Sequence, residues 1–274
     1  MKSIEFITEK EVKPYKSKNV TVDQAVATLN KYCSESLSTI SRPLWRGMTN
    51  HSAPIVVINP SSGKRESQNT SNYYTMIMDH SPYMQGWPKR SRSIVCTTDK
   101  GKAVRYGNGW DGGGTYAIFP FNGAKIAVCP AGDMWSTRLP GNRFGMNFTG
   151  PASMNDWLES LVLPDSWKEF NKQLNNEQWL DRVKKNIPKA FYKEMIKNPL
   201  ILLNTLYEVL SPQNAGFKLL SIQQFAAAVL KSNECWVDSQ VVAIRQDVYS
   251  DFLFAVANGD PPGVSTEEPV SLGK

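Results

Sequence analysis

Arg42-Pro43-Leu44-Trp45-Arg46-Gly47-Met48 is the stretch from which we interpret the rest of the chain. The proline and the apolar residues after it favour an extended strand that ends at an arginine and a glycine. The guanidinium of Arg46 offers a planar fork of hydrogen-bond donors, and Gly47 lets a ligand approach the main chain closely. This pattern suits a phosphate-binding strand end, although an ordinary strand that ends in Arg-Gly is more common.

The composition indicates a folded protein with a mild preference for anionic partners. The chain has 274 residues, of which 41% are hydrophobic, and this is enough to bury a sizeable core. Its 31 basic and 25 acidic residues give a net charge of +6. Nucleotides, nucleic acid and acidic proteins therefore all remain open as partners.

The cysteines and the apolar runs predict a protein of a reducing compartment. The four cysteines are far apart, form no Cys-x-x-Cys pattern and are accompanied by only two histidines, so we predict no metal site. No apolar run reaches the roughly 18 residues of a membrane span, and the N-terminus has no apolar signal segment. We therefore expect reduced core thiols and a cytoplasmic protein without a membrane partner.

Three local patterns in the first half of the chain predict regular elements. Thr21 to Gln24 fits a capping box for a helix that continues to Cys33. The polar stretch from Lys64 is expected to open a helix that continues to about Asp79. Two apolar runs within 116–129 flank Asn122-Gly123, and this spacing predicts a β-hairpin.

A strand, a hydroxyl-rich turn and a short helix follow one another between residues 93 and 107. The strand Ser93 to Cys96 ends at Thr97-Thr98-Asp99, and Asp99 is suited to cap a helix over 100–106. This unit is a good frame for a small polar ligand. The basic run Lys89-Arg90-Ser91-Arg92 lies just before it, and it either contacts a phosphate or nucleic acid or forms a solvated loop, which is the default.

Residues 153–231 differ in composition and predict a series of short amphipathic helices punctuated by prolines. Lysines recur there at every fourth position, but Pro188 interrupts their register, so we favour a solvated face over a binding stripe. These lysines are Lys185, Lys189, Lys193 and Lys197. The chain then returns to strands at 234–237 and 241–244, and a last amphipathic segment covers 248–256.

Three features in chain order resemble one protein superfamily. They are Leu-Trp-Arg-Gly at 44–47, Cys-Thr-Thr at 96–98 with Tyr106-Gly107 in the next helix, and the late strand that carries Glu234. This order resembles the ADP-ribosyltransferase superfamily, in the branch that uses an arginine, a serine/threonine-rich strand and a glutamate. The first strand is also similar to that of poly(ADP-ribose) polymerases, where a histidine stands in the place of Arg46.

Within this superfamily, the chain looks most like ADP-ribosyltransferase-like proteins encoded by bacteriophages. The runs 65–74 and 90–93 carry that similarity, and the whole resemblance covers about residues 40 to 135 and 225 to 245. It implies a phage protein for host takeover that acts in the cytoplasm of the host cell, with packaging in the virion as a further expectation.

The resemblance implies an α+β fold with an ADP-ribosyltransferase-like split, mixed or antiparallel β-sheet core. We expect a single domain over 1–257 that includes a helical insertion at 153–231, and a disordered tail over 258–274, which has three prolines and little apolar content. The implied function is mono-ADP-ribosyl transfer, in which NAD+ is the substrate and ADP-ribose passes to a host macromolecule. A host protein is the expected acceptor, nucleic acid is an alternative, and no metal is required.

The resemblance also assigns roles to individual side chains. Glu234 and Arg46 would be the catalytic residues, with Glu234 at the ribose 2′-hydroxyl and Arg46 at the phosphate or the adjoining ribose. A carboxylate beside that ribose favours the oxocarbenium-like transition state of N-glycosidic cleavage. The residues implied to bind NAD+ are Arg46, Gly47, Ser93, Thr97, Thr98 and Tyr106.

The sequence departs from the family pattern in two places. The serine-threonine-serine strand reads Cys-Thr-Thr at 96–98, and the position two before Glu234, which is Glu or Gln in arginine-modifying members, is Ser232. The acceptor is therefore open between arginine, another group and water. Three alternatives also stand: Glu234 as a solvent-exposed carboxylate on an edge strand, an inactive virion or structural protein with this fold, and a protein that binds nucleic acid or RNA ends through Arg90, Arg92 and the lysine-rich helix.

Overall fold

The computed structural model is a mixed α+β protein with a large antiparallel sheet, so the α+β prediction is confirmed. It describes residues 9–37, 42–49, 52–67, 71–107, 113–140, 148–164, 166–174, 176–198, 200–228, 230–257 and 268–273. The chain divides into two compact units. Unit 1 comprises 1–10, 65–86 and 133–218, and unit 2 comprises 11–64, 87–132 and 219–274. No helix in the described ranges has the length and apolar character to span a membrane.

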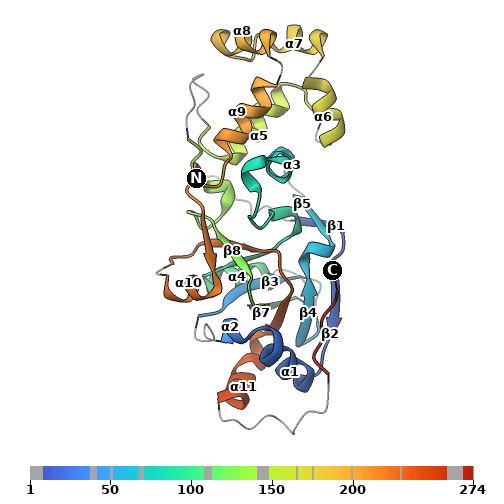
Figure 1. The fold of residues 1–274 in the computed structure, drawn as a ribbon, viewed down its shortest axis with the longest axis vertical. Helices are drawn as coiled ribbons and strands as arrows, with labels where there is room; N and C mark the ends of the chain where they lie inside the picture. The colour runs from blue at the N-terminus through green and yellow to red at the C-terminus, as the bar shows by residue number, and fades with distance from the viewer. Residues whose placement is uncertain are drawn as a thin grey trace. The chain divides into compact units, whose positions relative to one another are not determined.

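Unit 2 is built on a sheet of nine strands (Figure 1), and its neighbouring strands from β2 to β8 pair antiparallel. In spatial order the strands are β2 (Lys16–Asn19), β4 (Ile55–Asn59), β11 (Val241–Arg245), β7 (Gly114–Pro120), β3 (Leu44–Met48), β6 (Ile94–Thr97), β10 (Glu234–Val237), β8 (Lys125–Val128) and β9 (Lys218–Ser221). A separate two-stranded sheet consists of β1 (Glu9–Lys13) and β5 (Lys64–Ser67).

The large sheet is covered on both faces, which explains why its central strands are nearly continuous apolar runs. On one face, residues of α1 (Val22–Tyr32), α4 (Lys100–Gly107) and α11 (Gln246–Ala257) pack with Trp45 and Phe119. On the other face, α10 (Ile222–Ala227) packs against Leu44 and its neighbours. The short helix α2 (Ser34–Leu37) follows α1. The four cysteines are free and buried, which confirms the prediction of reduced core thiols.

Two helix starts in unit 2 follow the sequence predictions closely. Thr21 accepts a hydrogen bond from the Gln24 amide while the Gln24 side chain accepts from the Thr21 amide, so the predicted capping box at α1 is confirmed. Asp99 accepts from the Lys102 amide at 3.2 Å at the start of α4. Both helices begin where a short polar side chain satisfies an amide of the first turn.

The predicted hairpin at Asn122-Gly123 is wrong. β7 and β8 are separated in the sheet by β3, β6 and β10, although Gly123 does adopt the positive φ of a tight turn. The polar groups of Asn122 form hydrogen bonds with the α1–α2 segment. Its backbone N–H donates to Tyr32 O at 2.6 Å, and its side-chain Oδ1 accepts from the backbone N–H of Glu35 at 2.9 Å. The turn therefore anchors the corner between α1 and α2 instead of joining two paired strands.

The helix expected from Lys64 begins later than predicted. Residues Lys64–Ser67 form β5, in which Lys64 is exposed and Arg65 is buried, and this alternation belongs to a strand. The helix α3 covers only Tyr73–His80. The sequence from Lys64 thus begins as a strand, and the helix starts at Tyr73.

Unit 1 is mainly helical. Its longer helices are α3, α5 (Pro151–Ser160), α6 (Trp167–Leu174), α7 (Glu177–Val183), α8 (Lys189–Lys197) and α9 (Ile201–Val209). Their buried aromatic residues pack together, as in the ring contact between Tyr73 and Phe170. Short 3₁₀ turns occupy Pro60–Ser62, Pro82–Met84, Arg90–Arg92 and Met134–Ser136 in the two units. The predicted helical series of 153–231 is observed, but it also contains β9, which the pattern missed.

The last described residues pack within unit 2. The amide of Val270 donates to Thr28 Oγ1 at 2.9 Å, and the side chain of Val270 is buried. Asn59 Nδ2 donates to Gly273 O at 2.7 Å. Residues 268–273 thus depart from the disorder predicted for the tail, because main-chain bonds compensate for their low apolar content, while 258–267 lie outside the described residues.

Candidate functional site

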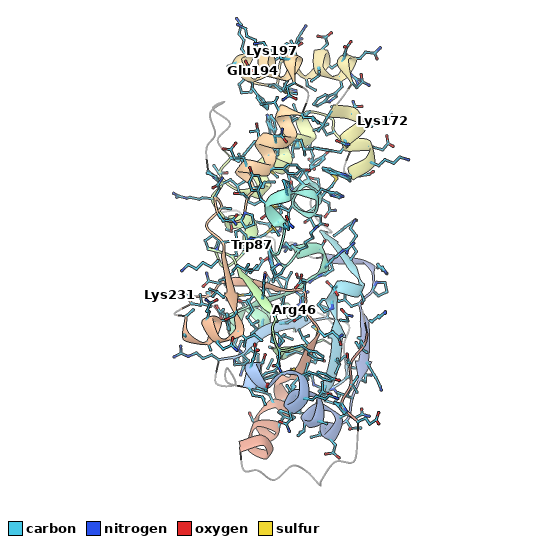
Figure 2. All side chains as sticks on the ribbon, viewed as in Figure 1. Arg46, Trp87, Lys172, Glu194, Lys197 and Lys231 are labelled. Atoms are coloured by element: carbon cyan, nitrogen blue, oxygen red, sulfur yellow. The ribbon has the colours of Figure 1, made fainter. Side chains whose placement is uncertain are left out.

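Strands β3, β6 and β10 are neighbours, so the three candidate segments meet in the middle of the sheet. Trp45 on β3 pairs with Thr97 on β6, and Thr97 pairs in turn with Glu234 on β10. Residues directly opposite each other on antiparallel strands share a face, so these three side chains leave the sheet on the same side. Arg46 follows Trp45 within β3 (Figure 2).

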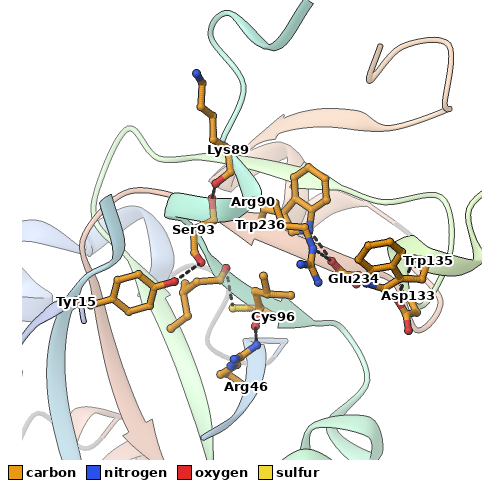
Figure 3. Close-up of polar contacts among 12 residues, drawn as sticks. Tyr15, Arg46, Lys89, Arg90, Ser93, Cys96, Asp133, Trp135, Glu234 and Trp236 are labelled. Atoms are coloured by element: carbon orange, nitrogen blue, oxygen red, sulfur yellow. Dashed lines mark hydrogen bonds and ion pairs between the residues drawn. The ribbon is translucent and has the colours of Figure 1, made fainter. Parts of the chain in front are cut away.

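Glu234 is a buried carboxylate in the interior of the sheet. Its residue is only 6% exposed, and β10 lies between β6 and β8. Figure 3 shows two donors that converge on its Oε1 atom: Trp236 Nε1 at 2.6 Å and Arg90 Nε at 3.2 Å. The alternative of a solvent-exposed carboxylate on an edge strand is therefore wrong.

Arg90 is the residue that the sequence analysis missed as a partner of Glu234. It lies in the 3₁₀ turn Arg90–Arg92 and is buried, whereas Arg92 is exposed. Both ends of the ion pair are about nine-tenths buried, so solvent screens it little. A buried acidic side chain implies a basic partner, but nothing local indicates which of the three nearby basic residues supplies it.

Arg46 spans an opening between β3 and β6. Among the described residues these strands share the single pair Trp45–Thr97, whereas β3 pairs with β7 along five residues. The Nη1 atom of Arg46 donates to Val95 O of β6 at 2.7 Å. Because side chains alternate along a strand, Arg46 leaves the sheet on the face opposite to Trp45 and Glu234. The structure therefore does not place the arginine and the glutamate on a common face.

Gly47 is explained by helix packing. A Cβ atom there would lie 2.4 Å from Ala103 O, 2.4 Å from Gly107 N and 2.6 Å from Tyr106 Cβ. Only glycine lets α4 lie so close to β3. Tyr106 is partly exposed on that helix, 39%. Gly47 and Tyr106 are thus brought together, through the packing of α4.

The three candidate hydroxyl groups form hydrogen bonds with the main chain. Thr97 Oγ1 accepts from the Asp99 amide at 3.1 Å, and Thr98 Oγ1 accepts from the Asn233 amide at 2.9 Å. Ser93 Oγ donates to Lys89 O at 2.7 Å. Thr97 closes the turn after β6, Thr98 links this turn to the residue before β10, and the serine fixes the turn that carries Arg90.

Ser232, two positions before Glu234, is held in an unusual conformation. Its φ of 54° lies in the left-handed region, which a non-glycine residue rarely adopts. Its hydroxyl donates to Asp99 Oδ2 at 2.8 Å, and Lys102 Nζ donates to Ser232 O at 3.3 Å. The hydrogen bond from Ser232 and then that from the Lys102 amide lower the pKa of the Asp99 carboxyl. Sequence spacing gave no sign of this contact.

Thiol and metal chemistry gain no support at this place. Burial, and then the proximity of Cys96, raises the pKa of the Cys235 thiol well above its ordinary value, which leaves it a poor nucleophile. In the described part of the chain, no group of His, Cys, Asp and Glu side chains is arranged to hold a metal ion. The site is one buried carboxylate, its two donors and the hydroxyl groups beside it.

No family model, curated protein or solved structure matches the chain at a significant level.

Proposed function

We propose that the chain is an NAD+-dependent mono-ADP-ribosyltransferase of the arginine, serine/threonine and glutamate type. One observation supports this above the others: the candidate strands are adjacent, and Thr97 and Glu234 are paired on one face with the carboxylate already oriented by two donors. A fixed, buried carboxylate is what stabilisation of an oxocarbenium-like ribose requires.

The reaction breaks the bond between ribose C1′ and the nicotinamide nitrogen. Nicotinamide leaves with the bonding electron pair, a nucleophile of the acceptor forms a bond to C1′, and the acceptor loses a proton. In the proposal, Glu234 accepts a hydrogen bond from the ribose 2′-hydroxyl and offsets the positive charge that develops on the ring. Trp236 and Arg90 keep the carboxylate in place during this step.

The proposal gives Arg46 the pyrophosphate of NAD+. Its guanidinium now donates to a neutral carbonyl, that of Val95, and a phosphate oxygen is the stronger acceptor because it is charged. Because Arg46 and Glu234 leave the sheet on opposite faces, the proposal requires the pyrophosphate to reach Arg46 through the opening between β3 and β6, where Arg46 would exchange Val95 O for phosphate. Gly47, Ser93, Thr97, Thr98 and Tyr106 complete the NAD+-binding set of the proposal, and no metal takes part.

The acceptor in this proposal is a host macromolecule, a protein in the first instance. Ser232 has no carboxylate to orient an arginine, but its hydroxyl contacts the ionised Asp99. Transfer to another group, or to water, is consistent with that difference. A phage origin, action in the host cytoplasm and packaging in the virion belong to the same proposal.

The test is incubation of the full chain with NAD+ labelled in its adenylate half, with and without host lysate. We expect label on a macromolecule or release of nicotinamide, and Glu234→Gln should abolish both because the amide carries no charge. Glu208→Gln, at an exposed position of α9, is the matched control and should behave like wild type. Unfolding curves confirm that each variant is folded. An inert wild-type protein, or an active Glu234→Gln, would refute the enzyme.

A non-catalytic protein with the same sheet is the second candidate. It is favoured by one observation: the key polar groups have internal partners, with Glu234 bound to Arg90 and Arg46 bound to Val95 O. In that case Glu234→Gln would change stability and nothing else. Phage particles assembled without the protein would be defective although the wild-type protein shows no turnover of NAD+.

A further inference from the structure

One short segment of unit 1 carries most of the net charge of the chain. Residues 182–197 contain six basic side chains and one acidic side chain, a net charge of +5, against +6 for the whole protein. All six basic residues are exposed. They form what we call the basic surface, which consists of Arg182, Lys184, Lys185, Lys189, Lys193 and Lys197.

The lysines of α8 form a row on its outer side. Phe191 and Met195 are the buried residues of this helix, and Lys189, Lys193 and Lys197 recur every four residues on the opposite side. Four residues advance a helix by about 6 Å, so the row places one positive charge at each step of that length. Figure 2 shows Lys197 and Glu194 projecting from the same helix.

Pro188 does not break this row. It is the N-cap residue of α8, so the helix begins just after it. Of the four lysines in the predicted every-fourth-residue pattern, only Lys185 lies before the proline, in the connection from α7. The interruption expected from the sequence therefore affects one lysine, and three remain in register.

Little acidic charge opposes the basic surface. Lys197 and Glu194 form an exposed pair at 3.5 Å, which contributes little to stability. The five other basic side chains make no ion pair within the described part of the chain. Asp181, at the edge of the surface, accepts a hydrogen bond from the Tyr192 hydroxyl. The charge is therefore available to a partner.

From this arrangement we infer that the basic surface binds the phosphate backbone of nucleic acid without regard to sequence. A row of exposed positive charges is attracted to the dense negative charge of a nucleic-acid backbone, since duplex DNA carries about one negative charge per 1.7 Å of axis. Lysine is depleted in protein–protein interfaces, which favour aromatic residues and arginine. An anionic membrane suits it less, since Phe191 and Met195 face the core and Ile196 is the one large apolar side chain that α8 exposes, too little for insertion.

The experiment is fluorescence anisotropy of a labelled random-sequence duplex titrated with the full chain at several salt concentrations. We expect binding at low salt that weakens steeply as salt rises. The triple variant Lys189→Glu, Lys193→Glu, Lys197→Glu should weaken it by on the order of tenfold or more. Lys→Gln at these positions should lower the slope of log K against log[salt] by about 0.9 for each lysine that contacts a phosphate.

The control changes the same net charge elsewhere. Lys13→Glu, Lys18→Glu, Lys231→Glu reverses three exposed lysines of unit 2 and should leave most of the affinity intact. An equal loss in both triple variants would mean that net charge alone drives association, and would overturn the inference. So would absence of binding at low salt, competition by polyglutamate as effective as by DNA, or binding to anionic vesicles that DNA does not displace.

Discussion

Thr97 and Glu234 lie directly opposite each other on β6 and β10, so a hydroxyl and a buried carboxylate share one face of the sheet. Each has its own hydrogen-bond donors: Thr97 accepts from the Asp99 amide, and Glu234 accepts from Arg90 and Trp236. Both side chains are therefore held in place without a ligand.

Removal of Arg90 should destabilise the fold strongly. Arg90→Ala leaves the carboxylate of Glu234 buried without its cation, and the loss of one partner from a buried pair costs about 3 to 5 kcal/mol in unfolding free energy. Urea unfolding measures this. Arg92→Ala, in the same turn but exposed, should change the unfolding free energy by less than about 0.5 kcal/mol. Similar values for the two variants would contradict the role given to the pair.

Gly47→Ala should disrupt the packing of α4 on β3. The new methyl group would meet two backbone atoms at 2.4 Å, so the helix must shift, and overpacking of this kind costs about 1 to 3 kcal/mol. Thermal and urea unfolding report the effect. Gly101→Ala on the same helix is the control: its Cβ meets only a side-chain oxygen at 3.2 Å, and alanine favours a helix. A tolerated Gly47→Ala would show that α4 is not held in this way.

Acid should weaken the contact between Asp99 and Ser232. The pKa of Asp99 is lowered from 3.8 in the fold, so its ionised form stabilises the protein above that pH. This contribution is lost as the pH falls through the lowered pKa of the folded state. In unfolding curves at successive acidic pH values, Asp99→Asn should therefore show a shallower loss of stability than wild type. Ser232→Ala removes the hydroxyl that lowers the pKa most and should reduce the same dependence. An unchanged pH profile in both variants would exclude the contact as a source of acid sensitivity.

Arg46→Lys tests whether the arginine binds NAD+. Lysine keeps the positive charge but loses the planar fork of donors that grips a pyrophosphate. If the proposed enzyme is correct, KM for NAD+ should rise by on the order of tenfold while kcat changes less, because binding supplies most of the role. Steady-state release of nicotinamide gives both constants. If KM and kcat were identical to those of wild type, Arg46 would not bind NAD+, and its role would be only the hydrogen bond to Val95 O.

Local patterns predicted much of the secondary structure because their causes are local. The capping box at Thr21, the apolar strand at Ile94–Thr97 and the cap at Asp99 each depend on residues a few positions apart. The failed hairpin had a non-local cause: Asn122 bonds to residues about ninety positions away. Local sequence contains no information about that competition.

The candidate site was predictable only in part for the same reason. Strand order brings Thr97 and Glu234 together, and the family resemblance suggested that grouping. The partner of Glu234 and the packing reason for Gly47 depend on contacts between distant segments. The face from which Arg46 leaves the sheet depends on register, and a shift of one residue reverses it.

The single Trp45–Thr97 pair has a mechanical consequence for the sheet. Fewer main-chain links cross there than at β10–β8, where two residue pairs are formed, or at β3–β7, where there are five. Among the described residues, β3 and β6 are therefore held together by fewer main-chain links than the strand pairs on either side of them, and the Arg46 side chain adds a bond across this place. A force that separated β3 from β6 would thus meet little main-chain resistance beside the residues on which the proposed chemistry depends.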